Sequence, residues 1–241
     1  MSRSSNAIGA RRGVEDAVAA VAAGEPVLIH DAADREGEVD LVYPAAAVDA
    51  EDVARMRNDA GGLVCVALPD DVCATWGLPF VQETIEHPAA ESHDLSYDDR
   101  SSFSLTVNHR DTFTGITDAD RALTISELGA AAAEVRRATA LAGDGAHDAV
   151  AAGPEAFAER FRAPGHVHLL RAASDLLDDR EGHTELGVAL ADAAGVEPAV
   201  VVCEMLDDEG AGALPPAGAR AYADRHGLVY VEGSELLVRF G

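Results

Sequence analysis

Lysine is absent from this chain of 241 residues. All 18 basic residues are arginine, against 43 acidic residues, and the formal net charge is −25. A chain without a basic stripe cannot displace counterions from nucleic-acid phosphates, so we expect no nucleic-acid partner. An acidic, lysine-free surface binds water and cations and stays soluble in concentrated salt. We therefore predict a protein adapted to a salty, halophilic cytoplasm, although an ordinary acidic protein is the simpler interpretation.

Cysteine and long apolar segments are also scarce. The spacing of the three cysteines, Cys65, Cys73 and Cys203, fits neither a zinc knuckle nor a disulfide framework, which indicates a reducing compartment. No run of about 18 apolar residues is present, so we expect no transmembrane helix and no membrane partner. The first six residues are polar and no apolar stretch follows them, so we expect no signal peptide. These features predict a cytoplasmic protein.

Aromatic residues make up only 5% of the chain, so the core must be built mainly from Ala, Val and Leu. Periodicity and capping residues predict helices at residues 14–23, 49–60, 126–141, 183–194 and 216–226. Apolar or alternating runs predict strands at residues 26–30, 41–46, 63–68, 102–108, 167–170, 199–203 and 228–231. This alternation indicates a layered α/β (α+β) sandwich with a mixed sheet and flanking helices. The longest loops are too short to be clear linkers, so we expect a single domain over residues 1–241.

An acidic loop lies between the first two expected strands. It runs from Asp31 to Asp40 and holds five carboxylates in ten residues. Such charges must be solvated, paired or neutralised by a cation, and oxygen ligands of this kind suit Mg²⁺ or Mn²⁺. Arg35, inside the loop, can hold a phosphate or sugar oxyanion. The simpler interpretation is a solvated acidic turn.

A second cluster, Arg180 to Glu185, directly precedes an expected helix. The N-terminus of a helix offers unpaired N–H groups and a partial positive charge, which suit a phosphate. Gly182 allows close approach of the backbone, while Arg180 and Thr184 can add donors. His183 can offer a neutral imidazole to a metal ion. The alternative is a helix cap with a surface histidine.

Two further residues are candidates for proton transfer. His166 follows Pro164 and Gly165 directly ahead of an apolar strand, where a fixed imidazole can act as an acid or base. Glu204 ends the buried strand expected at 199–203, and a partly desolvated carboxylate there can act as a base. A structural histidine and a solvent-facing glutamate are the alternatives.

Taken together and in this order, these segments resemble the 3,4-dihydroxy-2-butanone 4-phosphate synthase family of riboflavin biosynthesis. The matching segments are residues 34–40, 62–66, 113–121, 164–166, 182–185, 203–204 and 207–210. Residues 101–108 resemble the archaeal branch of the family. Gly37 and Val39 depart from the usual bacterial residues but leave the charged positions intact. Ala163 separates Arg162 from Pro164, which leaves the role of Arg162 open.

The resemblance implies that D-ribulose 5-phosphate is converted to L-3,4-dihydroxy-2-butanone 4-phosphate and formate. Negative charge builds on adjacent sugar oxygens in such a reaction, and Mg²⁺ or Mn²⁺ would stabilise it. It implies that Glu36 and His183 are the metal ligands and that His166 and Glu204 are the essential acid/base pair. Residues implied to bind the substrate or line the site are Asp31, Arg35, Glu36, Glu38, Asp40, Cys65, Arg180, Glu181, Gly182, His183 and Thr184. Cys65 could equally be a core residue.

The resemblance also implies a homodimer with its site near the subunit interface. Some family members carry a GTP cyclohydrolase II domain with a zinc-binding cysteine set, which we do not expect here. Whether one or two ions bind stays open. The alternatives are another metal-dependent phosphosugar isomerase or aldolase-type lyase, which is distinguished by formate release, and a non-catalytic nucleotide- or metabolite-binding module.

The charge of −25 opposes the approach of an anionic substrate. Salt screens this repulsion, because the Debye length falls to about 3 Å at 1 M ionic strength. We therefore expect activity to rise with salt concentration even when Mg²⁺ is saturating. Initial rates measured over a salt series at fixed excess Mg²⁺ test this expectation, and the highest activity in dilute buffer would contradict it.

Overall fold

One mixed sheet of seven strands organises the chain. The computed structural model describes residues 12–31, 36–90, 100–142 and 153–241. The strands are β1 (Val27–His30), β2 (Val39–Pro44), β3 (Cys65–Leu68), β4 (Phe103–His109), β5 (Phe161–Arg171), β6 (Val200–Glu204) and β7 (Val229–Glu232). Their order is β4-β5-β3-β6-β2-β1-β7. The β1–β7 and β3–β5 pairs are parallel and the other pairs antiparallel, which confirms the expected mixed sheet.

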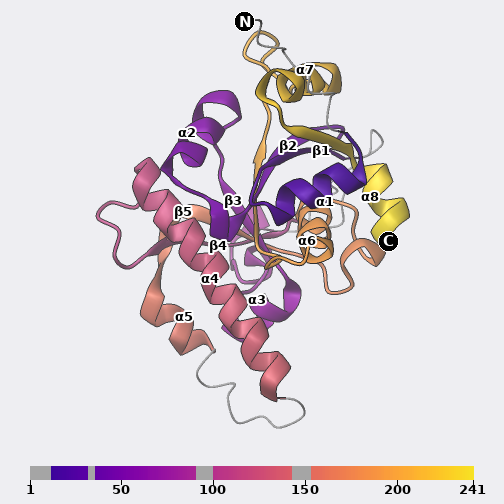
Figure 1. Ribbon diagram of the computed structural model, residues 1–241. Coiled ribbons are helices and arrows are strands. Elements are labelled where there is room, and N and C mark those ends of the chain that lie inside the picture. Colours follow the sequence, from indigo (N-terminus) through magenta and orange to yellow (C-terminus); the bar gives the residue numbers. More distant parts are fainter. Residues whose placement is uncertain (1–11, 32–35, 91–99, 143–152) are drawn as a thin grey trace, which may run out of the picture.

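Helices cover both faces of the sheet (Figure 1). One face packs against α1 (Val14–Ala22), α6 (His183–Ala193) and α8 (Gly233–Phe240). The other packs against α2 (Ala50–Asp59), α3 (Asp70–Trp76), α4 (Asp118–Ala142), α5 (Pro154–Arg160) and α7 (Pro216–His226). The expected sandwich of helices around a mixed sheet is therefore confirmed. Among the described helices, none combines the length and apolarity needed to span a bilayer.

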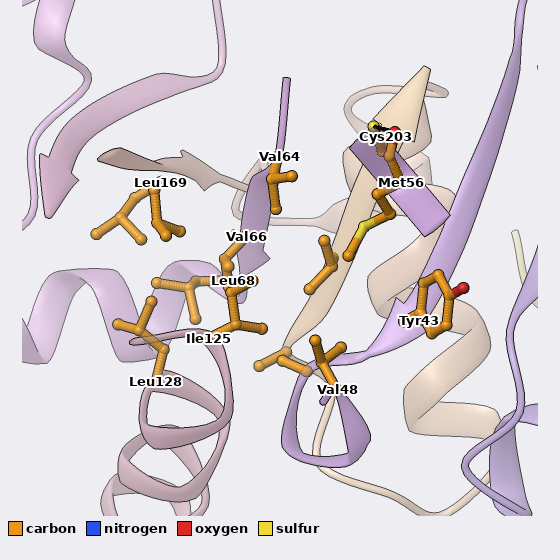
Figure 2. Close-up of a cluster of buried hydrophobic side chains, with 14 of the residues drawn as sticks. Tyr43, Val48, Met56, Val64, Val66, Leu68, Ile125, Leu128, Leu169 and Cys203 are labelled. Atoms are coloured by element: carbon orange, nitrogen blue, oxygen red, sulfur yellow. Dashed lines mark hydrogen bonds between the residues drawn. The ribbon is translucent and has the colours of Figure 1, made fainter. Parts of the chain in front are cut away.

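The larger core lies between β3 and α4 (Figure 2). Val66 and Leu68 of β3 are fully buried, as are Ile125 and Leu128 of α4. Burying an aliphatic side chain of this size contributes roughly 1.5–3 kcal/mol. This core therefore fixes the centre of the sheet, on whose other face α6 carries His183.

Several predicted elements occur where the sequence places them. Helix α2 begins after Asp49, whose carboxylate accepts hydrogen bonds from the backbone N–H groups of Glu51 and Asp52, at 2.8 and 3.1 Å. Strand β2, expected at residues 41–46, instead covers Val39–Pro44. This shift matters for the site, because Asp40 lies within the strand, directly opposite Glu204 of β6.

Helix α4 begins at Asp118, eight residues before the expected cap at Ser126. Thr117 is the residue that caps it, since its hydroxyl accepts a hydrogen bond from the backbone N–H of Asp120 at 3.1 Å. The hydroxyl of Ser126 lies inside the helix and donates to the Leu123 carbonyl at 3.3 Å. The sequence prediction was wrong here because a serine hydroxyl can bond back to the preceding turn as well as cap a helix.

Strand β5 begins at Phe161, six residues before the expected start. Pro164 and Gly165 suggested a turn, but residues 163–166 form a bulge between the pairs Val107–Val167 and Asn108–Arg162. A Cβ on Gly165 would lie 1.9 Å from the Val107 carbonyl carbon, so this position admits only glycine. The short helices α3, α5 and α8 were also missed, because seven or eight residues show little periodicity.

Substituting Gly165→Ala should lower the free energy of unfolding by at least about 1–3 kcal/mol, because the new methyl group clashes with the backbone of β4. Gly212→Ala is the matched control: a Cβ there would meet nothing within 4 Å, so its cost should stay within about 0.5 kcal/mol. Urea denaturation of the two variants measures the difference. Equal stabilities would contradict the close packing of the bulge.

Candidate active site

A cluster of carboxylates surrounds His183 where β1, β2 and the N-terminus of α6 meet. Ligand atoms of Asp31, Glu36 and His183 lie within 4.8 Å of one another. The Nδ1 atom of His183 is 3.8 Å from a carboxylate oxygen of Glu36 and 3.8 Å from one of Asp40. Asp31 closes the loop, because its carboxylate accepts from the backbone N–H groups of Glu36 and Glu38, at 3.3 and 3.1 Å. The structure therefore brings together the two expected metal ligands, although they are far apart in sequence.

The imidazole of His183 is oriented by the backbone of β1. Its Nε2 lies 3.2 Å from the Ile29 carbonyl, which can only accept a hydrogen bond. A neutral imidazole that donates through Nε2 presents the lone pair of Nδ1 to the carboxylates. Carboxylate oxygens and one imidazole nitrogen form a suitable donor set for Mg²⁺ or Mn²⁺. The residues present therefore fit a divalent cation, and Asp31 is a third candidate ligand.

The pKa values of the clustered side chains are shifted toward the forms that carry a proton. Burial lowers the pKa of His183, but the carboxylates of Asp40, Glu36 and Asp31 raise it by more, to about 9. Burial raises the pKa of Asp40 to about 6, with His183 opposing this shift and Glu204 adding to it. Without an ion, protons on His183 and the acids partly neutralise the repulsion.

Glu38 and Glu204 form a carboxyl pair beside this cluster. The charge of Glu204 acts on Glu38, so the two carboxyl groups lie close enough to interact. Burial, followed by the charge of Glu204, raises the pKa of Glu38 to about 7. Glu204 is half-buried at the end of β6, as the sequence suggested. A carboxyl group whose pKa is raised to near neutrality, as that of Glu38 is, is typical of a site that performs acid/base chemistry.

The N-terminus of α6 carries the expected phosphate-binding residues. Arg180 donates from Nη1 to a carboxylate oxygen of Glu185 at 2.8 Å, and the other oxygen of Glu185 accepts from the Ala173 N–H at 3.0 Å. A Cβ on Gly182 would lie 2.8 Å from Nη1 of Arg180, so glycine at this position leaves room for the guanidinium. Thr184 is buried in the first turn. Glu181 precedes the helix with an exposed side chain, and its role in substrate binding stays a prediction.

The remaining predicted site residues lie apart from the cluster or outside the described chain. His166 is exposed on the bulge of β5 and hydrogen-bonds to Asn108. Its strand is two positions from β6 in the sheet, so roughly 10 Å separates the two backbones. Cys65 is buried in the apolar layer against α6, and burial, with Asp40 adding, raises the pKa of its thiol. Arg35 lies outside the described residues.

Comparison with known proteins decides the family. The family model described as 3,4-dihydroxy-2-butanone 4-phosphate synthase matches residues 15–239. The chain belongs to this family. A synthase from Archaeoglobus fulgidus is 44% identical over 235 residues, covering 94% of this chain and 93% of that protein. A synthase from Methanosarcina acetivorans is 46% identical over 234 residues, covering 93% of this chain and 89% of that protein.

Solved structures of the synthase share the fold. A synthase crystallised in complex with two magnesium ions is 29% identical, with a TM-score of 0.74, over 94% of this chain and 95% of that one. The synthase of Candida albicans is 26% identical, with a TM-score of 0.73, over 97% of this chain and all of that one. These likenesses confirm the expected family, fold and enzyme class.

Sequence reasoning missed three contributors to the site. Glu185 stood in a recognised segment, but its buried contact with Arg180 was not anticipated. Asn108 was noted only as the end of a strand, and its contact with His166 depends on the bulge. The Ile29 carbonyl that orients His183 is a backbone group, which no residue pattern could identify.

Metal binding should be coupled to proton release. The pKa of about 9 keeps His183 mostly protonated at pH 8 in the metal-free protein, and a protonated nitrogen cannot bind an ion. Raising the pH removes this competing proton, so the apparent affinity for Mg²⁺ should increase by up to about tenfold per pH unit below 9.

Isothermal titration calorimetry in two buffers of different ionisation enthalpy measures the protons released on Mg²⁺ binding. We expect a release approaching about one proton per ion at pH 8. An affinity that does not change with pH, with no proton release, would contradict this assignment of His183.

Proposed function

We propose that the carboxylate–histidine cluster is where this chain converts D-ribulose 5-phosphate to L-3,4-dihydroxy-2-butanone 4-phosphate and formate, the reaction of its family in riboflavin biosynthesis. One observation carries the proposal. Glu36 and His183, separated by more than half of the chain, lie 3.8 Å apart among further carboxylates. Such repulsive charges are gathered at a cost in folding stability, which a bound cation offsets.

Glu36 and His183, together with Asp31, would hold Mg²⁺ or Mn²⁺. The bound cation would stabilise negative charge that develops on adjacent oxygens of the sugar. The hydrogen bond from Nε2 of His183 to Ile29 holds Nδ1 toward the ion site. Asp40, buried beside His183, and Arg35 would bind hydroxyl groups of the sugar.

The phosphate of the substrate would bind at the N-terminus of α6. Arg180 supplies a guanidinium held in place by the buried Glu185. Gly182 and Thr184 offer backbone N–H groups in the first turn, where the helix dipole is positive. This local positive charge counters the overall negative charge of the protein.

Protons would move through two groups. Glu204 would give or take a proton at the end of β6, with Glu38 beside it, and burial raises the pKa of Glu38 to about 7. His166, on the bulge of β5, would act as the second acid or base, with Asn108 beside its ring. Cys65 would be a packing residue in the apolar layer against α6, since a thiol with a raised pKa is a poor nucleophile.

The enzyme would act as a cytoplasmic, single-domain homodimer. Free, buried cysteines suit a reducing compartment. An apolar groove lies along the edge of the sheet beside the bulge that carries His166, and its lining includes Val81, Phe103, Leu105 and Pro164. Covering this groove with a second copy would bury apolar surface and place the interface next to His166.

Formate release tests the proposal, because an isomerase that shares the early steps makes none. Incubation with D-ribulose 5-phosphate and Mg²⁺ should yield formate. The Glu36→Ala and His183→Ala variants should each lose more than about 100-fold in rate, since even groups that merely support metal ligands contribute 10–100-fold. Glu51→Ala, on the exposed first turn of α2, is the control and should keep its rate. Full activity in both cluster variants would reject the site.

A further inference from the structure

Two β4 side chains hold the bulge that carries His166. The bulge removes backbone N–H groups of β5 from the regular ladder of hydrogen bonds with β4. The Thr106 hydroxyl accepts from the Gly165 N–H at 3.2 Å, and Oδ1 of Asn108 accepts from the His166 N–H at 2.8 Å. Asn108 is only 3% exposed. Its amide therefore replaces a backbone partner in the sheet.

The orientation of this amide is fixed by its two neighbours. Oδ1 faces a backbone donor, the His166 N–H, while Nδ2 lies 3.4 Å from an acceptor, the Thr114 carbonyl. Reversing the amide would place donor against donor and acceptor against acceptor. Asn108 thus has one orientation that satisfies both contacts.

The same amide contacts the imidazole ring of His166. Nδ1 of the ring lies 3.2 Å from Nδ2 of Asn108 and 3.3 Å from Oδ1. A donor and an acceptor are therefore both within reach of Nδ1. When Nε2 carries the ring proton, Nδ1 can accept from Nδ2. When Nε2 is deprotonated, Nδ1 can donate to Oδ1.

The loop behind Asn108 fits closely against it. The carboxylate of Asp120 accepts from the backbone N–H groups of Phe113, Thr114 and Gly115, at 3.4, 3.2 and 2.8 Å. Gly115 has a φ of 87°, and a Cβ there would lie 2.0 Å from Nδ2 of Asn108. Asp120 and Gly115 thereby keep the Thr114 carbonyl against Asn108.

We propose that Asn108 is a positioning residue for His166, which engages Nδ1 in either tautomer and leaves Nε2 to exchange protons with the substrate. A general acid/base that works through Nε2 alternates between the imidazolium and the neutral ring protonated at Nδ1, and in both states Nδ1–H can donate to Oδ1 of Asn108. The same contact therefore keeps the ring in place while Nε2 gains and loses its proton. This inference rests on the proposed acid/base role of His166.

Four variants test the inference: Asn108→Ala, Asn108→Asp, His166→Gln and Thr124→Val. Asn108→Ala should lower kcat by about 10–100-fold while KM changes less than about threefold, because the ring is lost from position and the cluster is untouched. Thr124→Val is the matched control. It removes a buried hydroxyl that accepts from the His109 N–H at 3.0 Å, so it should lower the thermal midpoint but keep kcat.

Nitrogen-15 NMR of labelled histidine adds a readout other than activity. The resonances of His166 are assigned by their loss in His166→Gln. Asn108→Asp keeps an acceptor for the His166 N–H but offers Nδ1 no donor, so we expect it to shift the tautomer toward Nδ1–H relative to the wild type. Unchanged ring shifts in both Asn108 variants would overturn the inference.

The outcomes separate this inference from the function on which it rests. If His166→Gln is inactive and Asn108→Ala keeps its kcat, the positioning role of Asn108 is rejected and the function stands. If His166→Gln is fully active, the acid/base role fails and the inference fails with it. If Asn108→Ala does not fold, Asn108→Asp tests the inference instead: a lower kcat with shifted ring resonances supports it, and wild-type values of both reject it.

Discussion

Repulsion among buried carboxylates is the constraint on which this structure depends. Asp31, Glu36 and Asp40 converge on the single imidazole of His183, and the Glu38–Glu204 pair lies beside them. Charges this close favour whatever neutralises them, whether protons, an imidazolium or a divalent cation. Burial raises the pKa values of Asp40 and Glu38, and the neighbouring carboxylates add to the shift; the carboxylates also raise the pKa of His183, against the effect of its burial. A bound cation would replace these protons, so we expect metal affinity to depend on pH.

The mixed sheet makes this convergence possible. Strands β1 and β2 are antiparallel neighbours, so the C-terminal end of β1 lies beside the N-terminal end of β2. The antiparallel pairing of β2 with β6 places Asp40 opposite Glu204. Helix α6 packs on one face of the sheet, and its first residue, His183, lies among the carboxylates. In the proposed function, this one helix would supply both the imidazole for the cation and the backbone N–H groups for the phosphate.

Much of this could be predicted from local patterns. The cap at Asp49, the glycine before α6 and the apolar run of β6 each act within a few residues, and the structure agrees with them. The proximity of Glu38 to Glu204, the length of β5 and the contact of Asn108 with His166 could not be predicted from the sequence. Each depends on strand register or on a bulge, which are set by contacts between distant segments.

A crystal structure of the protein soaked in Mn²⁺, with anomalous diffraction recorded, tests the central claim most directly. We expect an anomalous peak within about 2.0–2.3 Å of a Glu36 carboxylate oxygen and of Nδ1 of His183, as for a hard divalent cation with oxygen and imidazole ligands. A cluster without such a peak, while ions occupy acidic surface positions elsewhere, would contradict the account.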